Sequence, residues 1–376
     1  MKKVCIVTWS KSTNYGTCFQ AYALYRYIKS LGYDVCILKM FRAPYHIKCV
    51  LNWIYLKQKS FILIVKDMNK KSKNNINVSK SNKLEKFENN FTYLSIRNRK
   101  SWNAIKNDFI TFISGGDQIW NPNYISRSSL LDFLYHEDNI GKISYGTSIG
   151  VSEIPSRLRK IYSTFWKEYD SIGVREKQAA EMVERISNKK ATVVVDPVFL
   201  LSKNEWIDFA GISDYNKKIP KEYIFCYFVD VKNFYTNFSN KIRKKTGYPL
   251  VIISLEGKVE GDYVIEDAGP EDFILLLMSA SLVITDSYHG IVLSLIFNKK
   301  FYVLKRFLES SVKSEHSRIH EILDEYGLQN RLVDNVHFDI SEKIDFEDIN
   351  DKIIKNVVES KNFLKNNLDI LQVKNG

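Results

Sequence analysis

The chain has 376 residues and a formal net charge of +12 at neutral pH. This length exceeds that of one ordinary core and predicts two domains with insertions. Hydrophobic residues make up 45% of the chain, which excludes a wholly disordered protein. The basic balance suits an anionic partner. No basic segment with interleaved aromatic residues resembles a nucleic-acid motif, so we expect no nucleic-acid partner.

The cysteines and the apolar runs bear on the compartment. The five cysteines are widely spaced and none forms a CxxC pair, so we expect a reducing compartment without disulfides or zinc. The apolar run near the start is too short for a signal peptide, and no stretch is long and apolar enough to span a bilayer. The interrupted apolar segment 50–68 fits a helix lying on a membrane or one covering a core. We therefore expect a cytoplasmic protein, with peripheral contact to the inner membrane face as an alternative.

The first half of the chain alternates between apolar runs and helical patterns. The run VCIVTW is typical of a strand buried on both faces. After the break SKSTNYG, apolar residues recur at helical spacing from Ala21 to Leu31, and DVCILKM is the next expected strand. This βαβ pattern predicts a ligand-binding loop after the first strand. Further strands are expected at FITFIS, KISYGTSIG, SIGVRE and TVVVDPVFL, after a helical and loop insertion near residues 43–102.

The pattern restarts near residues 195–220. Strands are expected at YIFCYFV, PLVIIS, LVITDS and KFYVL, with helices between them. The tail alternates charged and apolar residues at helical spacing. The sequence thus predicts an α/β fold with two Rossmann-like, doubly wound domains and a cleft between them. We place the N-terminal domain at residues 1–200, the C-terminal domain at 201–340 and a helical tail at 341–376.

The segment TDSYHG, residues 285–290, places an acid, a hydroxyl, a phenol and a histidine where a strand ends. In an open α/β sheet the carboxyl ends of the strands face the ligand crevice. His289 at such an end can act as an acid or a base, and the helix that opens with Gly290 offers free N–H groups to an anion. The alternative is that His289 caps the helix or satisfies a buried carbonyl.

Two loops are further candidates for the same crevice. In SGGDQIWNP, Gly115 and Gly116 allow close backbone approach and Asp117 lies at a strand end, although a simple turn explains the pattern equally well. In NYGTCFQ, the candidates for cradling an anion at the start of the first helix are Asn14, Gly16 and Thr17.

Cationic residues form the remaining candidates. Arg175 lies between a strand and a helix, and its planar guanidinium suits a carboxylate or phosphate, with a surface ion pair as the alternative. Lys305, Arg306, Lys313 and Arg318 follow a strand and precede a helix, and they are candidates for lining the same crevice. The chain has no HExxH, Walker A or GxSxG motif, and we expect no metal site.

Taken together, these segments resemble the polysaccharide pyruvyl transferase family. The resemblance covers residues 1–334 apart from the insertion, and it rests on NYGTCFQAYAL, SGGDQIWNP, SIGVREKQAAEMV, VDPVFLL, TDSYHGIVLSLIFNKKFYVL and SRIHEILDEYGLQNRLVD. It implies a GT-B-like pair of Rossmann-type domains. It also implies transfer of pyruvate from phosphoenolpyruvate, without a cofactor, to sugar hydroxyls of a bacterial surface glycan or its lipid-linked precursor, giving a ketal.

The resemblance implies roles for individual residues. His289 would protonate the methylene carbon of the donor or assist phosphate departure. Arg175 would hold the donor's carboxylate or phosphate, and Asp117 would deprotonate the acceptor hydroxyl. Some members of the family have an arginine at the position of Ser287. Lys305, Arg306 or Arg318 would then have to supply the missing charge.

Two other functions stay open at this point. A GT-B glycosyltransferase that uses a nucleotide sugar would have the same architecture, and the helix that starts beside His289 would serve a diphosphate. A non-catalytic partner in a glycan-assembly cluster is the other alternative, and Ser287 in place of an arginine is the feature that favours it.

Overall fold

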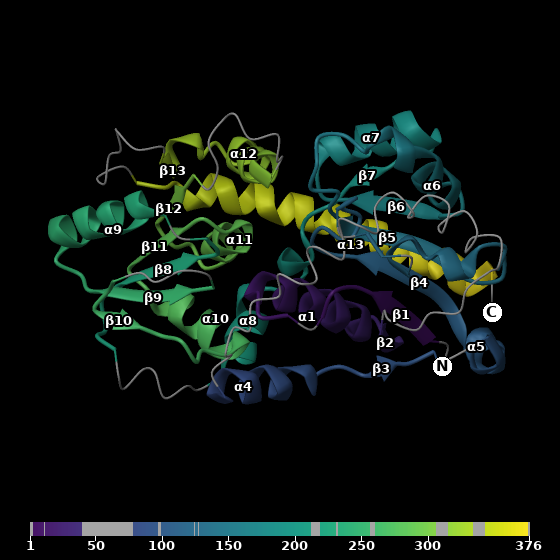
Figure 1. The fold of residues 1–376 in the computed structure, drawn as a ribbon, viewed down its shortest axis with the longest axis horizontal. Helices are drawn as coiled ribbons and strands as arrows, with labels where there is room; N and C mark the ends of the chain where they lie inside the picture. The colour runs from purple at the N-terminus through teal and green to yellow at the C-terminus, as the bar shows by residue number, and fades with distance from the viewer. Residues whose placement is uncertain are drawn as a thin grey trace.

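A computed structural model provides the fold. It describes residues 3–10, 12–39, 78–96, 99–123, 125–126, 128–211, 219–230, 232–255, 260–305, 315–333 and 343–374. Arg306, Lys313, the apolar segment 50–68 and most of the expected insertion lie outside the described residues. Figure 1 shows two lobes, each built on one sheet. We call them the first lobe and the second lobe in chain order.

The first lobe contains a seven-stranded sheet in the order β3-β2-β1-β4-β5-β6-β7. All its strand pairs are parallel. Its strands are β1 Lys3–Val7, β2 Asp34–Leu38, β3 Tyr93–Leu94, β4 Phe109–Gly115, β5 Gly141–Thr147, β6 Ser171–Val174 and β7 Thr192–Val193. The strand order reverses direction between β1 and β4, and a doubly wound sheet binds ligands at the carboxyl ends beside such a point.

The second lobe contains a six-stranded parallel sheet in the order β10-β9-β8-β11-β12-β13. Its strands are β8 Ile224–Phe228, β9 Leu250–Ser254, β10 Tyr263–Val264, β11 Leu282–Thr285, β12 Phe301–Leu304 and β13 Leu332–Val333. Every residue of β8 and β11 is buried, which explains their unbroken apolar sequences. The order reverses between β8 and β11, so the segment that follows β11 lies at this sheet's ligand-binding edge.

Helices cover the faces of both sheets. The α-helices are α1 Tyr15–Ser30, α4 Val78–Glu88, α5 Arg99–Ile105, α6 Ser156–Trp166, α7 Lys177–Ser187, α8 Lys203–Ala210, α9 Asn233–Thr246, α10 Pro270–Ser279, α11 Tyr288–Ile296, α12 Glu315–Glu325 and α13 Phe346–Lys374. Short 3-10 helices include η2 Lys106–Asp108, η3 Ser128–Leu130, η4 Asp132–Leu134, η5 Pro197–Leu200 and η7 Gln329–Arg331. In the described ranges, no helix combines the length and the apolar character that crossing a membrane requires.

Helix α1 joins the two lobes through buried aromatic contacts. The Tyr15 ring stacks on Phe273 of α10 at 4.9 Å between centroids and meets the edge of Tyr227 in β8 at 5.9 Å. The Tyr15 hydroxyl donates to the Ala268 carbonyl at 2.7 Å. Buried hydrophobic residues from both lobes form one continuous cluster around these rings. Tyr15 of the first lobe therefore helps to hold the second lobe in place.

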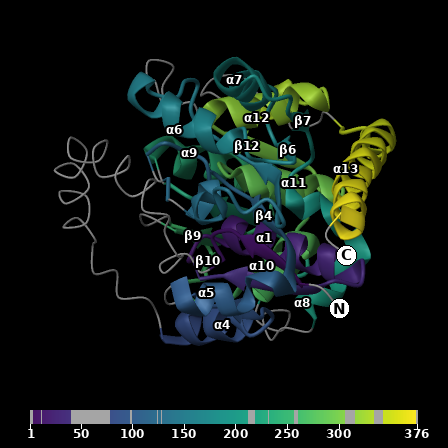
Figure 2. The same ribbon diagram turned by 90° about the vertical axis from the view of Figure 1, so that its right-hand side faces the viewer.

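The C-terminal helix α13 crosses from the second lobe to the first and covers the first sheet (Figure 1). Figure 2 shows it along one side of the molecule. Two strand glycines make room for it, because an added Cβ at Gly141 would lie 2.3 Å from Leu371 and one at Gly173 would lie 2.8 Å from Phe363. The expected helical tail is thus, in space, an outer layer of the first lobe.

The described part of the expected insertion contributes to the fold in a way that the sequence does not indicate. Its strand β3 pairs with β2 at the edge of the first sheet. Its helix α4 reaches the second lobe, where Lys83 lies 2.9 Å from Asp272 and the Ser79 hydroxyl donates to Asp267 at 3.0 Å. This segment therefore extends the first sheet and links the lobes.

Candidate functional site

The turn after β11 is held by its own polar residues. The Thr285 hydroxyl donates to the carbonyl of Tyr227 in β8 at 2.8 Å. The Asp286 carboxylate accepts from the backbone N–H groups of Val229 and Asp230 at 2.8 and 3.1 Å. Thr285 and Asp286 are fully buried. Thr285 and Asp286 therefore fix the turn. The residues that follow, Tyr288 and His289, contact Arg175 and Gly16 of the first lobe.

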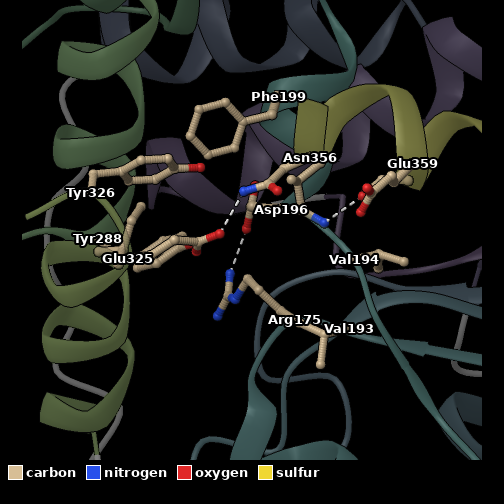
Figure 3. Close-up of a pocket in the computed structure, with 13 residues that line it drawn as sticks. Arg175, Val193, Val194, Asp196, Phe199, Tyr288, Glu325, Tyr326, Asn356 and Glu359 are labelled. Atoms are coloured by element: carbon tan, nitrogen blue, oxygen red, sulfur yellow. Dashed lines mark hydrogen bonds and ion pairs between the residues drawn. The ribbon is translucent and has the colours of Figure 1, made fainter. Parts of the chain in front are cut away.

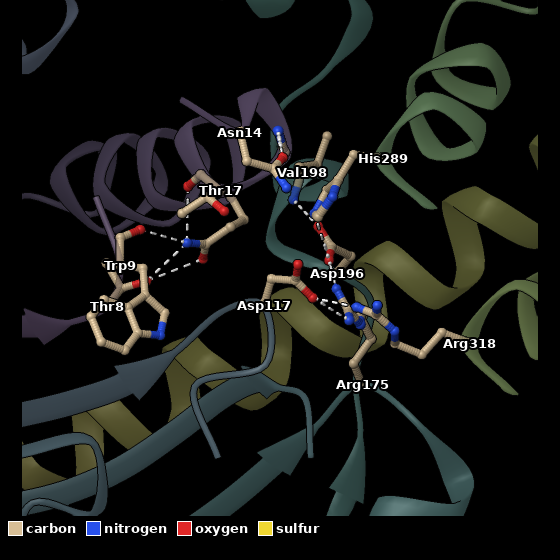
Figure 4. Close-up of polar contacts among 12 residues, drawn as sticks. Thr8, Trp9, Asn14, Thr17, Asp117, Arg175, Asp196, Val198, His289 and Arg318 are labelled. Carbon is tan, nitrogen blue, oxygen red and sulfur yellow. Dashed lines mark hydrogen bonds and ion pairs between the residues drawn. The ribbon is translucent and has the colours of Figure 1, made fainter. Parts of the chain in front are cut away.

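His289 lies in the first turn of α11 and packs against the first turn of α1 (Figure 4). An added Cβ at Gly16 would lie 2.1 Å from His289 Nδ1, so glycine is needed there to leave space for the imidazole. Asn14 caps α1, because its side-chain oxygen accepts from the Gly16 N–H at 3.0 Å. The loop that was predicted to cradle an anion thus packs against His289 at the boundary between the lobes.

The glycines at the end of β4, its last residue Gly115 and the next residue Gly116, meet structural requirements. Gly116 has a φ of +105°, and an added Cβ there would lie 1.8 Å from Gln20 Oε1. Gly115 leaves space for a neighbouring backbone carbonyl. The Gln20 amide donates to the carbonyls of Trp9 and Thr17 at 3.1 and 3.0 Å. These contacts fix the loops after β1 and β4 at the edge where the sheet reverses its order.

Arg175 directly follows β6 and lies at the centre of a buried charge cluster (Figure 4). Its Nε lies 3.1 Å from Glu176, its Nη1 2.5 Å from Asp196 and its Nη2 2.8 Å from Asp117. Its carbon Cζ lies 4.3 Å from the ring centroid of Tyr288, a cation–π contact. Burial alone would lower its pKa, but the carboxylates outweigh burial and hold the pKa above its ordinary value. Three carboxylates already compensate the charge of this arginine.

Asp117 lies between two arginines. Its Oδ1 accepts from Arg175 and, at 2.5 Å, from Arg318 of α12. Burial alone would raise the pKa of Asp117, but Arg318 and Arg175 outweigh it and hold that pKa far below its usual range. Such a carboxylate stays ionised at neutral pH and is a weak proton acceptor. The contacts therefore favour an electrostatic role for Asp117 over the predicted role of base.

Asp196 connects the cluster to His289. Its Oδ2 lies 3.6 Å from His289 Nε2, and its Oδ1 accepts from the Val198 N–H at 2.9 Å, which caps η5. Burial opposes ionisation of Asp196, but His289 and Arg175 outweigh it and keep its pKa below the ordinary value. His289 Nε2 is buried and has no hydrogen-bond partner among the described residues. This nitrogen therefore faces a carboxylate and makes no hydrogen bond to another described residue.

The other residues expected to bind the donor lie around the start of α11. Ser287 is its N-cap residue, and the serine side chain makes no capping hydrogen bond. Gly290 lies in the first turn, where an added Cβ would be 2.5 Å from the Thr285 hydroxyl. Lys305 directly follows β12, the parallel neighbour of β11, and so lies at the same edge of the sheet.

The structure thus brings four predicted site residues together, namely His289, Asp117, Arg175 and Arg318. The prediction assigned no role to Asp196 or Glu176, which bind the same arginine. Asp196 carried a usable signal, because it follows β7 as Asp117 follows β4, and carboxyl ends of parallel strands meet at one edge. Within the residues described, no group of three or more His, Cys, Asp or Glu side chains is arranged to hold a metal ion.

Two cavities adjoin this cluster. The one in Figure 3 has a volume of about 190 Å³ and lies between Arg175, Asp196 and Tyr288 on one side and α12 and α13 on the other. The second has a volume of about 340 Å³ and shares Arg175 and Tyr288 with the first. The charge cluster therefore borders space that a small molecule or a sugar residue can enter.

Solved structures with the same architecture include two sugar-nucleotide epimerases. UDP-GlcNAc 2-epimerase from Methanocaldococcus jannaschii has a TM-score of 0.51 and 12% identity, and the match covers 95% of this chain and 92% of that chain. UDP-GlcNAc 2-epimerase from Neisseria meningitidis, bound to UDP-GlcNAc, has a TM-score of 0.50 and 10% identity, with 100% and 94% covered. At such identities the likeness shows the fold alone. It confirms the predicted pair of Rossmann-like domains in a GT-B-like arrangement.

Sequence comparisons are more specific about the family. No curated protein sequence matches the chain. Residues 14–306 match the family model described as polysaccharide pyruvyl transferase. This match spans more than half of the chain and includes α1, the ends of β4 and β6 and the segment with His289. The chain is therefore a transferase that belongs to the polysaccharide pyruvyl transferase family.

Proposed function

We propose that this enzyme transfers pyruvate from phosphoenolpyruvate to two hydroxyls of one sugar, in a bacterial surface polysaccharide or its lipid-linked precursor, and forms a ketal. The family itself supports pyruvate transfer to polysaccharide in general. The observation that carries the finer proposal is the arrangement at His289. A buried imidazole nitrogen without a hydrogen-bond partner among the described residues lies 3.6 Å from a carboxylate, at the ligand-binding edge of the second sheet.

The proposed reaction balances with His289 as the acid. A proton from His289 adds to the methylene carbon of phosphoenolpyruvate, which makes C2 electrophilic. One sugar hydroxyl forms a bond to C2, the C2–O bond to phosphate breaks, and the second hydroxyl then adds to C2. Of the two hydroxyl protons, one restores His289 and the other leaves with phosphate. The proton needed for the next cycle is thus supplied by the acceptor.

The buried charges define the supporting roles. Asp196 faces Nε2 at 3.6 Å, and we assign it to orienting the imidazole. Arg175 is compensated by three carboxylates, so we assign it to holding Asp117 and Asp196 in place rather than to direct donor binding. His289, once it has given up its proton, is better suited than Asp117 to receive one from a hydroxyl.

The donor anion then needs another site. The Ser287 N–H donates to the Thr285 hydroxyl at 3.1 Å, but the side chain of Ser287 does not cap α11, so the N–H of Gly290 in its first turn suits a phosphate or carboxylate. Lys305 and Arg306 follow the neighbouring strand and are the cations that we assign to the remaining charge. Several preorganised cations and N–H groups would be required, because the donor carries multiple negative charges.

Calorimetric titration and phosphate release test this proposal. Phosphoenolpyruvate should bind the wild type, whereas UDP-glucose and GDP-mannose should not. With methyl glucoside as a minimal acceptor, His289→Asn should reduce phosphate release by roughly 10²–10⁴-fold, the usual contribution of a general acid. His136→Asn is the matched control, because His136 is exposed and its positive φ suits asparagine.

Two outcomes would overturn the proposal. Nucleotide-sugar binding without phosphoenolpyruvate binding would favour a glycosyltransferase. Absence of binding to every ligand would favour a non-catalytic partner in glycan assembly.

A further inference from the structure

The larger cavity beside the charge cluster has walls from both lobes. Its volume of about 340 Å³ lies at the lower end of the range typical of small-molecule sites. Its lining comes from the turn after β6, from β7, from the start of α11 and from one face of α12. The α12 residues follow residue 306, where the family match ends. The part of the lining that α12 contributes therefore lies outside the family match.

Two buried polar atoms in the lining of this cavity have no hydrogen-bond partner among the described residues. They are Oε2 of Glu176 and Nε of Arg318. Both side chains line the cavity and are more than nine-tenths buried, with 7% and 8% exposed. Buried polar groups are almost always hydrogen-bonded in folded proteins, so each of these atoms calls for a partner. Sugar hydroxyls suit both atoms, because a hydroxyl O–H donates to a carboxylate and a hydroxyl oxygen accepts from a guanidinium.

The charges of the wall disfavour an anionic occupant, because its carboxylates outnumber its cations. Carboxylates of Glu176, Glu321, Asp324 and Glu325 line the cavity. The cations Arg175, Lys177 and Arg318 also line it. The charges of Arg175 and Arg318 already face buried carboxylates, which leaves Lys177 against the remaining acids of the wall. Burial raises the pKa of Glu321 and of Glu325, and the neighbouring Glu176 adds to the shift at Glu321. A further carboxylate or phosphate in this space would meet like charges.

We propose that this cavity is the acceptor subsite, and that it takes a sugar ring with hydroxyl or ammonium groups and without a carboxylate or phosphate. The inference rests on the proposed function for the identity of the acceptor. Tyr288 lines the cavity, and its ring lies 5.4 Å from the imidazole of His289 between centroids, so one side chain separates a ring bound here from that histidine. The donor and the acceptor thus occupy regions of opposite electrostatic character.

Three methyl glycosides of one ring configuration test the charge preference. Methyl glucoside, methyl glucosaminide and methyl glucuronide are titrated into the full chain and followed by ligand-observed NMR. The neutral and amino glycosides should bind, and the glucuronide should bind roughly tenfold more weakly than the glucoside. In the double variant Glu321→Gln/Glu325→Gln, the preference for the amine over the uronate should fall by roughly tenfold. Glu181→Gln on the exposed side of α7 is the control, and it should keep the wild-type ratios.

The ratios between glycosides decide the outcome. Equal binding of the three glycosides, tighter binding of the glucuronide, or no binding of any would overturn the subsite, and so would unchanged ratios in the double variant. If the double variant does not fold, the single variants Glu321→Gln and Glu325→Gln and the preference of the wild type among the three glycosides test the subsite instead. Phosphoenolpyruvate binding to the wild type is measured separately. Its loss with the charge preference intact contradicts the proposed donor, whereas donor binding without a charge preference contradicts the subsite.

Discussion

At the scale of single residues, Gly16 is constrained by a side chain of the opposite lobe. Gly16→Ala would place a methyl group 2.1 Å from His289 Nδ1 and displace the imidazole. Displacement of a catalytic group by about 1 Å costs roughly 10²-fold in rate, so we expect that loss in phosphate release. A double-mutant cycle with His289→Ala checks the cause by thermal unfolding. The destabilisation caused by Gly16→Ala should disappear when the ring is absent, and persistence of that cost would contradict the contact.

Asp196 offers a second prediction at this scale. Asp196→Asn keeps an oxygen for the Val198 N–H but removes the charge that faces His289 and Arg175. We expect a fall in kcat of roughly 10²-fold, because His289 loses the carboxylate that orients its imidazole. Asp132→Asn is the control, since Asp132 is also fully buried and belongs to η4. Equal losses of kcat in the two variants would show that Asp196 acts only through stability.

The sequence indicated the site residues better than their partners. His289, Asp117 and Arg175 all follow apolar strands, and the carboxyl ends of parallel strands meet at one edge. Their pairing depends on distant parts of the chain, since Arg175 is 58 positions from Asp117 and Arg318 is 201 positions from it. Local patterns contain no information about such contacts. This explains why the sequence predicted Arg175 as a free anion-binding group although three carboxylates surround it.

At the scale of elements, α13 depends on how its apolar stripe meets the first sheet. Leu371 is buried against Gly141, whereas the adjacent Ile370 is 63% exposed. We expect Leu371→Ala to lower the free energy of unfolding by roughly 2–5 kcal/mol, the usual cost of truncating a buried leucine. Ile370→Ala is the matched control, and it should change stability by less than about 0.5 kcal/mol. Urea unfolding measures both, and equal effects would contradict the packing of α13.

The long buried strands were predictable, whereas of the short edge strands only β7 lies within a predicted strand, TVVVDPVFL. Strands such as β4 and β8 are buried along their whole length, and β8 appears as an unbroken apolar run while β4 is interrupted only by small polar residues. The edge strands β3, β7, β10 and β13 have two residues each, too few to show a period. For this reason β3 was hidden inside the expected insertion.

At the scale of the whole molecule, buried carboxylates control stability against acid. The pKa values of Asp117 and Asp196 lie below their ordinary value, despite burial, because Arg175, Arg318 and His289 favour the ionised forms. A carboxylate of this kind stabilises the fold above its unfolded pKa of about 4, and this stability is lost as the pH falls further. We therefore expect the free energy of unfolding to decrease steeply below about pH 4.

Urea unfolding at several pH values measures this decrease. The variant Asp117→Asn/Asp196→Asn should show a flatter dependence below about pH 4, because it lacks the two groups that take up protons on unfolding. Glu321 and Glu325 act in the opposite direction at higher pH, since burial raises their pKa values and protonation relieves that cost. A wild-type stability that stays constant between about pH 5 and pH 3 would contradict the assignment of the buried cluster.

The packing of α13 also sets the order in which the protein is assembled during synthesis. The chain leaves the first lobe after η5, forms the second lobe, and returns to the first sheet with α13. A chain emerging from the ribosome folds its N-terminal parts first. The face of β5 around Gly141 therefore remains uncovered until Leu371 has been made, after every strand of the second lobe. During translation the first lobe thus has an apolar face that chaperones can bind. This face is covered by α13 only after the second lobe has been synthesised.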